Sequence, residues 1–178
     1  MTRSAIMVIY SQLNVTNVYG QKRSVNWQGK SDIEFASGFA NSTALKTASG
    51  DTPAQNFWDN SNNNTTVWTD LFKLAELGST AVEGIRNSDL LKQKPDAMKR
   101  YLGEALVLRS LAYFELVRRW GDVPFRSETS SSDLSNVYIY KVSRDRVYNV
   151  IIDNMKEAID YLPYIGVVPE YTVERVRN

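Results

Sequence analysis

The sequence contains neither cysteine nor histidine among its 178 residues. Without cysteine, the chain forms no disulfide, holds no metal through thiolates and has no thiol nucleophile. Without histidine, it lacks the side chain that most often serves as a general base or a metal ligand near neutral pH. Catalysis would have to depend on carboxylates, lysine or tyrosine. We therefore expect a protein that is not an enzyme, with no catalytic residues, no cofactor and no metal site.

The chain also has no excess of positive or of negative charge. The chain has 21 basic and 20 acidic residues, a net charge of +1, which gives no electrostatic basis for binding nucleic acid. No apolar run approaches the about 20 residues that a membrane-spanning helix needs, and residues 1–10 do not have the form of a signal peptide. The hydrophobic share of 43% is nevertheless ample for the core of one domain.

The longest helical pattern covers residues 96–120. Its apolar side chains recur at intervals of three and four, which places most of them on one face of a helix: Leu102, Ala105, Leu106, Leu108, Ala112, Tyr113, Leu116, Val117 and Trp120. Pro95 suits the first helical position because its missing N–H is not needed there. Gly121 is a natural residue after a helix end, and Pro124 cannot continue a helix. The pattern therefore predicts a helix with sharply defined ends.

Glu104 and Arg109 place charge on or beside the apolar face of this helix. A charge on a buried face needs a partner, so we expect both residues to make structural contacts and not to bind a ligand. Asp122 and the C-terminal carbonyl groups of a neighbouring helix are candidate partners for Arg109. We also interpret Gly121, Asp122 and Pro124 as a helix cap and turn with a structural role.

Three more helices are predicted, over residues 4–18, 67–86 and 143–162. Ser143 is a favourable N-cap for the last of them, and Pro163 ends it. Because helices joined by short connections pack antiparallel, residues 67–86 and 96–120 are expected to form a helical hairpin. The sequence thus predicts an all-α, tetratricopeptide-like helical bundle, although no clean internal repeat of that period is present. It would form one domain over residues 1–178, with its helical core in residues 65–163.

Residues 21–64 form a long irregular loop in this scheme, with short helices plausible at residues 32–39 and 54–59. A second loop is predicted at residues 125–142. More than forty residues without helical period inside a compact domain are unusual, and such loops are often functional. The loop over residues 21–64 is therefore the place where we look for a binding site.

Two tryptophans of that loop, Trp27 and Trp58, are candidates for binding sugar. An indole face stacks on the apolar C–H face of a sugar ring, while neighbouring polar side chains bond the hydroxyl groups. Asn56, Asp59 and Asn60 flank Trp58 and are suited to that second task. The alternative is that both tryptophans pack the loop onto the helices, and the sequence leaves this open.

The run EALVLRSLAYFELVRRWGDVPF, residues 104–125, resembles a signature of the SusD/RagB-like nutrient-binding lipoproteins of Bacteroidetes outer membranes. Two further blocks agree with the helices that precede and follow it in that family, VWTDLFKLAELGSTAVEGI and VSRDRVYNVIIDNMKEAIDYLP. The positions that match the signature are Glu104, Ala105, Leu108, Arg109, Ala112, Tyr113, Phe114, Gly121, Asp122, Val123 and Pro124. Residues 1–64 fit the family only loosely.

The resemblance implies a surface-exposed protein of the outer membrane that binds oligosaccharides or other nutrients through loop aromatics. Such a protein delivers its ligand to a TonB-dependent transporter of the SusC type and performs no chemistry. Family members are longer and are anchored through an acylated cysteine, so we expect this chain to be the N-terminal portion of such a lipoprotein, with the lipid anchor absent from it. A helical-repeat module that binds a protein partner and an all-α enzyme working with carboxylates are the alternatives.

Overall fold

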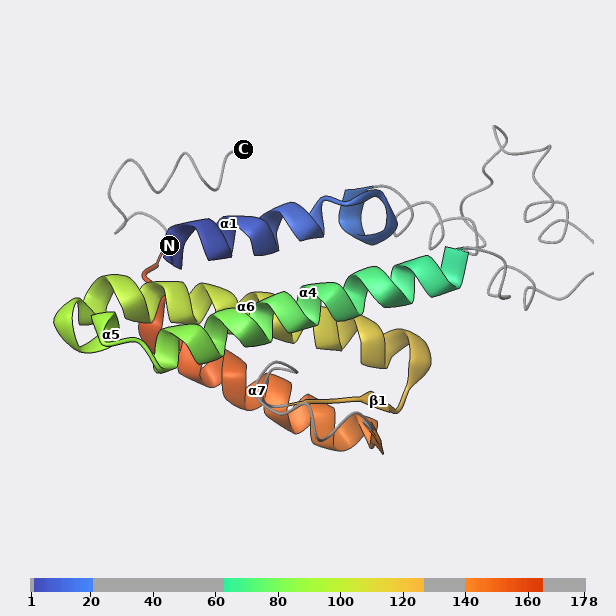
Figure 1. Cartoon of the computed structure of the whole chain (residues 1–178). Coiled ribbons are helices and arrows are strands. Elements are labelled where there is room, and N and C mark those ends of the chain that lie inside the picture. Colours follow the sequence, from blue (N-terminus) through green and yellow to red (C-terminus); the bar gives the residue numbers. More distant parts are fainter. Residues whose placement is uncertain (1, 21–62, 127–139, 165–178) are drawn as a thin grey trace, which may run out of the picture.

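The computed structural model describes residues 2–20, 63–126 and 140–164. Most of these residues are helical, and the predicted all-α class is confirmed (Figure 1). The elements, in chain order, are α1 (Thr2–Leu13), a π-helical turn η1 (Thr16–Gly20), α4 (Asn63–Arg86), α5 (Leu90–Gln93), α6 (Pro95–Trp120), the short strands β1 (Val123–Pro124) and β2 (Lys141–Val142), and α7 (Arg144–Tyr161). The short helices predicted at 32–39 and 54–59 lie outside the described residues.

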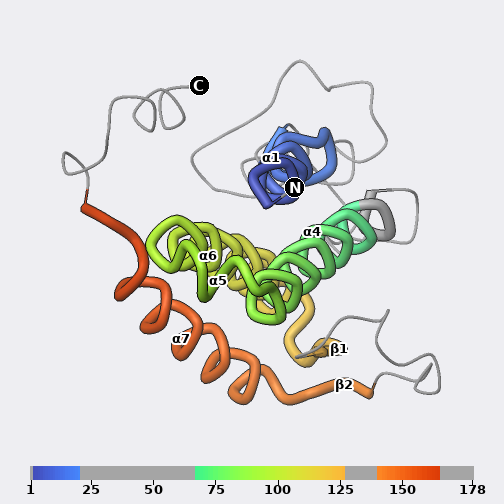
Figure 2. The backbone as a smooth tube through the Cα atoms, turned by 60° about the vertical axis from the view of Figure 1, so that its left-hand side comes forward, coloured from blue at the N-terminus to red at the C-terminus, as the bar shows by residue number. Residues whose placement is uncertain are grey.

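Helix α6 lies at the centre of the bundle. It packs against α4, α7 and α1, and α1 also contacts α4. Figures 1 and 2 show α4 and α6 as an antiparallel pair joined through α5, with α1 and α7 on different sides of α6. This pair is the predicted helical hairpin. Because α6 is covered from three directions, its buried residues include polar side chains as well as apolar ones.

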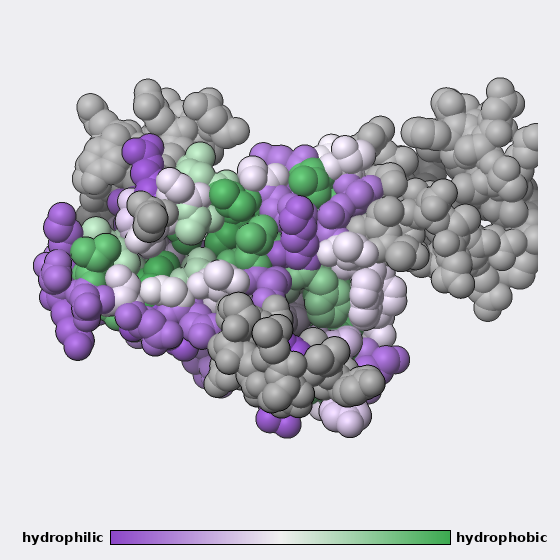
Figure 3. Space-filling view, in the orientation of Figure 1, coloured by the Kyte–Doolittle hydropathy of each residue, from purple (hydrophilic) through white to green (hydrophobic). Residues whose placement is uncertain are grey.

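The core is built from the apolar faces that the helical spacing indicated. Fully buried side chains come from every long helix, including Ile6, Leu74, Leu106, Leu116 and Val147. Each contributes about 1.5–3 kcal/mol relative to an exposed position. On the face seen in Figure 3, apolar surface also gathers over α1 and the adjoining part of α4, where Met7 and Val8 of α1 are each 49% exposed. No helix in the described part of the chain has the length and apolar character needed to cross a bilayer.

Helices α4 and α6 approach each other closely at Gly78. A Cβ atom on this residue would lie 2.8 Å from Cβ and 3.0 Å from Cα of Arg109. Carbon atoms in contact are ordinarily about 3.5–4.0 Å apart. The missing side chain of Gly78 therefore sets the distance between the two helices of the hairpin, a role that its position in the middle of a predicted helix did not reveal.

The side chain of Asp122 joins the end of α6 to the start of α7. Gly121 ends α6 with φ of 72°, a conformation that favours glycine, and its N–H bonds the carbonyl of Val117 at 2.9 Å. Asp122 Oδ1 then accepts the N–H of Arg144, the first residue of α7, at 2.9 Å. Ser143 makes no side-chain capping bond. Ser143 is the N-cap residue, as predicted, but a carboxylate from the turn after α6 supplies the acceptor in place of its hydroxyl.

Two further differences from the sequence predictions concern short elements. The first helix ends at Leu13, not at residue 18, and the chain continues through η1, where Val18 has φ of −102° and ψ of −113°. The second predicted loop contains β2, which pairs antiparallel with β1 so that Val123 faces Val142. Strands of two residues have no period to detect, so this pairing could not be predicted from spacing.

Candidate functional site

The four residues predicted to bind sugar, Trp27, Asn56, Trp58 and Asn60, lie outside the described residues. The structure does describe the two points between which their segment runs. Gly20 ends η1 and Asn63 begins α4, and both lie at the end of the bundle where α6 finishes (Figure 1). The candidate site is therefore approached through the residues that fix this end of the bundle.

Asp70 of α4 accepts hydrogen bonds from Gln12 and Asn17, two residues that lie shortly before the segment over residues 21–62. Its Oδ2 accepts a hydrogen bond from Asn17 Nδ2 at 2.6 Å. Gln12 Nε2, at the end of α1, donates to the backbone carbonyl of Asp70 at 3.4 Å and to Oδ1 at 3.5 Å. Gln12 is itself buried, so these bonds satisfy an amide that burial would otherwise penalise. They tie α1 and η1 to α4.

Glu115 of α6 forms a second polar cluster at this end. Its carboxylate is 1% exposed and accepts the hydroxyl of Tyr19 at 3.0 Å. Arg118 Nη2 donates to its two oxygens at 3.3 Å and 3.1 Å, and Arg119 Nε lies 3.8 Å from Oε2. A buried carboxylate is tolerated only when paired in this way. Because Tyr19 precedes Gly20, the cluster anchors the start of the segment to the central helix.

Aromatic rings of α4 and α6 also pack at this end of the bundle, which we call the base because residues 21–62 attach to it. Trp68 and Trp120 meet edge to face with centroids 4.9 Å apart, and Phe72 lies 4.6 Å from Trp68. All three rings are half-buried and pack against the core. Edge-to-face aromatic pairs of this kind contribute about 0.5–1.5 kcal/mol beyond the burial of their area. The segment over residues 21–62 thus begins and ends on a well-packed base.

The charges of the α6 face are engaged in contacts between and along helices. Arg109 is 5% exposed, and its Nη2 donates to Asn154 Oδ1 of α7 at 2.8 Å. Burial, followed by repulsion from Arg86, lowers the pKa of Arg109. Arg100 Nε lies 3.6 Å from Glu104 Oε1. The expectation that Asp122 pairs with Arg109 is wrong, since Asp122 bonds the start of α7 and Asn154 takes its place.

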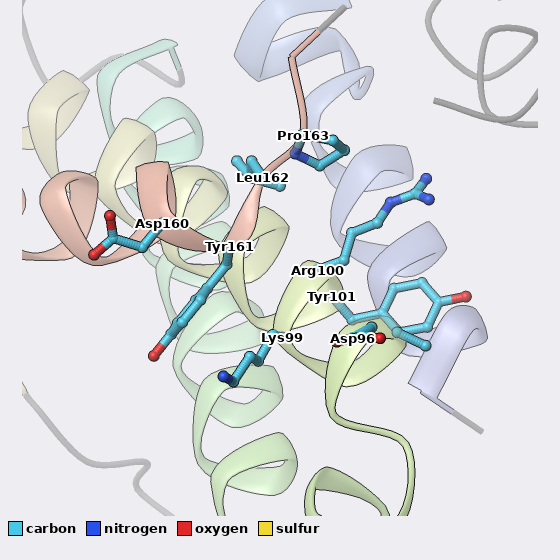
Figure 4. A pocket seen from close by; sticks show the side chains of 9 residues that line it. Asp96, Lys99, Arg100, Tyr101, Asp160, Tyr161, Leu162 and Pro163 are labelled. Carbon is cyan, nitrogen blue, oxygen red and sulfur yellow. The ribbon is translucent and has the colours of Figure 1, made fainter. Parts of the chain in front are cut away.

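A pocket lies at the other end of the bundle, between the start of α6 and the end of α7 (Figure 4). Its volume is about 670 Å³, and it is lined by Asp96, Ala97, Lys99, Arg100, Tyr101, Asp160, Tyr161, Leu162 and Pro163. Lys99 Nζ lies 5.8 Å from the centre of the Tyr161 ring. Sequence reasoning did not find this pocket, because its two halves are about sixty residues apart and each occupies a helix end without a motif.

Burial raises the pKa of the Tyr161 phenol, and the charge of Glu157 together with a hydrogen bond to that carboxylate raises it further. The phenol donates its one hydrogen to Glu157, and its oxygen can still accept a hydrogen bond. In residues 2–20, 63–126 and 140–164, no three acidic side chains gather closely enough to hold a metal ion.

Comparison with known proteins gives one family over almost the whole chain. A family model described as SusD-like, starch-binding and associating with the outer membrane matches residues 6–172. One SusD-like protein of Formosa agariphila is 26% identical over 109 residues, which cover 61% of this chain and 20% of the relative. A second from the same organism is 31% identical over 85 residues, 47% of this chain and 17% of the relative. The chain thus matches at most about a fifth of the length of these curated relatives.

Solved structures share the fold at low sequence identity. A SusD homolog from Bacteroides thetaiotaomicron superposes with a TM-score of 0.68 at 22% identity, over 92% of this chain and 30% of the homolog. A SusD-like carbohydrate-binding protein from Bacteroides vulgatus gives 0.64 at 18% identity, over 94% and 37%. A chain crystallised with a xylogluco-oligosaccharide gives 0.62 at 19% identity, over 91% and 30%. Each of these chains is about three times as long as the part that matches.

Proposed function

This chain belongs to the SusD-like family, as its helical signature predicted, and from that membership we propose that it is part of a cell-surface glycan-binding protein. The protein binds oligosaccharides at the outer membrane and delivers them to a TonB-dependent transporter of the SusC type. The observation that carries the proposal is the family match over residues 6–172. Two structural relatives, one named as carbohydrate-binding and one holding a xylogluco-oligosaccharide, support it.

We place glycan binding in the segment over residues 21–62. Trp27 and Trp58 supply ring faces for stacking, and Asn56 and Asn60 supply amides that bond hydroxyl groups in both directions. Support comes from the base on which the segment is mounted, where Asp70 and Glu115 fix both α1 and η1. These bonds fix the residues that directly precede the segment, and a fixed attachment point limits the freedom that is lost when a ligand binds.

The proposed protein carries out no chemical step. Its contribution to uptake is capture and handover, so the helices serve as a scaffold and Glu104, Arg109, Gly121, Asp122 and Pro124 have structural roles. Membrane attachment is proposed to come from a lipid anchor on a longer parent protein and not from the helices described above. Handover requires contact with the transporter, which is a protein partner of the same assembly.

Tryptophan fluorescence tests the proposal, because the chain has four tryptophans, two of them in the segment and two in the base. Titration with malto- and xylogluco-oligosaccharides is expected to shift the emission of the natural chain and to leave the Trp58→Ala variant unchanged. Trp120→Phe is the matched control, since Trp120 packs on Trp68, and it is expected to retain the response. A natural chain that ignores a broad glycan panel would point instead to a protein partner, and turnover of a glycan would contradict a purely binding role.

A further inference from the structure

The pocket at the start of α6 lies far from Gly20 and Asn63, the two points between which the segment with the proposed glycan site runs. Residues 21–62 attach where α6 ends, whereas the pocket is formed where α6 begins and α7 ends (Figure 1). From Tyr101 to Trp120 the helix rises roughly 30 Å at about 1.5 Å per residue. The length of α6 therefore separates the pocket from these attachment points, and the pocket is considered through its own lining residues.

The pocket exists because two helix ends come close together. Gly103 of α6 is buried, and a Cβ atom on it would lie 2.9 Å from Leu162 Cγ and 3.2 Å from Tyr161 Cβ. Its missing side chain lets the last turn of α7 settle against α6. Pro163 follows directly and cannot continue the helix, so α7 ends here. Leu162 and Pro163 form an apolar wall beside the charged start of α6.

The lining combines rings, donors and acceptors. Lys99 and Arg100 provide positive charge, and Asp96 and Asp160 provide an equal negative charge. In Figure 4, Tyr161 lies beside Lys99, whereas Arg100 and Tyr101 point toward α1. Arg100 also contacts Glu104 at 3.6 Å, which holds its guanidinium along the edge of the pocket. Asp96, Lys99 and Asp160 are exposed, whereas Arg100, Tyr101 and Tyr161 are half-buried.

This balance selects among ligand classes. An anion would meet Asp96 and Asp160, and an organic cation would meet Lys99 and Arg100. A metal ion would find two carboxylates accompanied by two cations. A purely apolar compound would strip water from four charged groups without bonding them, at a cost of several kcal/mol. A neutral polyhydroxylated molecule has C–H faces for the rings and the apolar wall, and hydroxyls that bond both signs of charge.

We infer that this pocket is a second carbohydrate-binding site, which holds an end or a short stretch of a neutral oligosaccharide. Tyr101, Tyr161, Leu162 and Pro163 contact the C–H faces of the sugar. Asp96 and Asp160 accept its hydroxyl protons, and Lys99 and Arg100 donate to its oxygens. The volume of about 670 Å³ lies within the range of about 300–1,000 Å³ usual for small-ligand pockets. The inference rests on the proposed function for its class of ligand but not for its place on the molecule.

The test uses the 178-residue chain with tyrosines labelled for NMR, titrated with maltoheptaose and with a xylogluco-oligosaccharide. Trp58→Ala serves as the background, so that binding at the segment over residues 21–62 does not mask the pocket. The signals of Tyr101 and Tyr161 are expected to shift saturably, while that of Tyr164 stays in place. Tyr164 is the internal control, because it is 83% exposed and does not line the pocket.

Substitutions then assign the contacts. Tyr161→Ala is expected to weaken binding in this background roughly tenfold, which is the loss of one aromatic contact. Asp160→Asn keeps the size of an exposed side chain and is expected to weaken binding severalfold, so the inference does not depend on one variant. Tyr164→Ala is expected to leave affinity unchanged. Circular dichroism of each variant verifies that the bundle is folded.

The outcomes separate this inference from the proposed function. If the natural chain binds a glycan and Trp58→Ala abolishes all binding without any shift at Tyr101 or Tyr161, the pocket is not a sugar site and the proposed function stands. If both tyrosine shifts persist in Trp58→Ala, and the shift of Tyr101 is lost when Tyr161→Ala is added, the second site is established. A chain that binds neither oligosaccharide contradicts both proposals.

Discussion

The contact between α4 and α6 at Gly78 offers a sharp test of the packing. Replacing Gly78 by alanine puts a methyl group 2.8 Å from Arg109 Cβ and 3.0 Å from Arg109 Cα. The helices would have to separate by roughly 0.7 Å to reach even the short end of ordinary carbon–carbon contact, about 3.5 Å. Because the nearest atoms belong to the backbone and Cβ of a buried residue, rotation of a side chain cannot relieve the overlap.

The same helix contains a matched control. A Cβ atom on Gly84 would meet nothing within 4 Å, and Gly84 is exposed. Alanine is favoured over glycine inside a helix by roughly 0.5–1 kcal/mol, so Gly84→Ala is expected to stabilise the chain by that amount. Gly78→Ala has the same gain, but overpacking costs about 1–3 kcal/mol. The two variants should therefore differ by about 1–3 kcal/mol in the free energy of unfolding.

Urea unfolding followed by circular dichroism measures this difference as a shift between two midpoints. In thermal unfolding, a difference of 2 kcal/mol corresponds to roughly 4–8 °C for a chain of this size. Gly103→Ala is expected to fall between the two variants, since its nearest atoms belong to the side chains of Leu162 and Tyr161 and not to a helix backbone. A Gly78→Ala variant as stable as Gly84→Ala would refute the close approach of α4 and α6.

Three further predictions concern single side chains. Asp122→Ala is expected to lower the free energy of unfolding by about 1 kcal/mol, since it removes the acceptor that caps α7. Ser143→Ala should lower it by about a few tenths of a kcal/mol at most. Equal effects of the two variants in urea unfolding would contradict this assignment. Asn154→Ala leaves the buried guanidinium of Arg109 without its acceptor at 2.8 Å and should lower the free energy of unfolding by about 1–3 kcal/mol. Adding Arg109→Met to this variant removes the unpaired charge and should recover much of the lost stability. Burial raises the pKa of Tyr113, so the unfolded chain loses the phenol proton first and the free energy of unfolding falls as pH rises above about 10. In Tyr113→Phe, the free energy of unfolding should fall less steeply above this pH. The same pH dependence in both chains would argue against a buried phenol.

The long helices could be predicted because their signals are local. The spacing of three and four, with Pro95 before and Gly121 after, predicted residues 96–120, and α6 covers Pro95–Trp120. The first helix was predicted too long because the apolar Val18 follows Leu13 in the sequence. Val18 is buried, but it belongs to η1, and α1 has already ended at Leu13.

Contacts between distant segments could not be predicted in the same way. The cap of α7 comes from Asp122, twenty-one positions before Ser143, and the acceptor for Arg109 is Asn154 on another helix. Neither pair has a spacing rule, because both depend on how α6 and α7 pack. The pocket at the start of α6 follows from that packing as well. The predicted sugar-binding residues Trp27, Asn56, Trp58 and Asn60 remain predictions, since they lie outside the described residues.

The central claim is that this chain binds glycans through the segment over residues 21–62. Isothermal titration of the natural chain, Trp58→Ala and Trp120→Phe with one oligosaccharide that the natural chain binds tests it most directly. The claim predicts saturable binding that Trp58→Ala weakens at least about tenfold, the value of one lost stacking contact, and that Trp120→Phe retains. Equal affinity of the natural chain and Trp58→Ala, or no binding of any glycan by the natural chain, would contradict it.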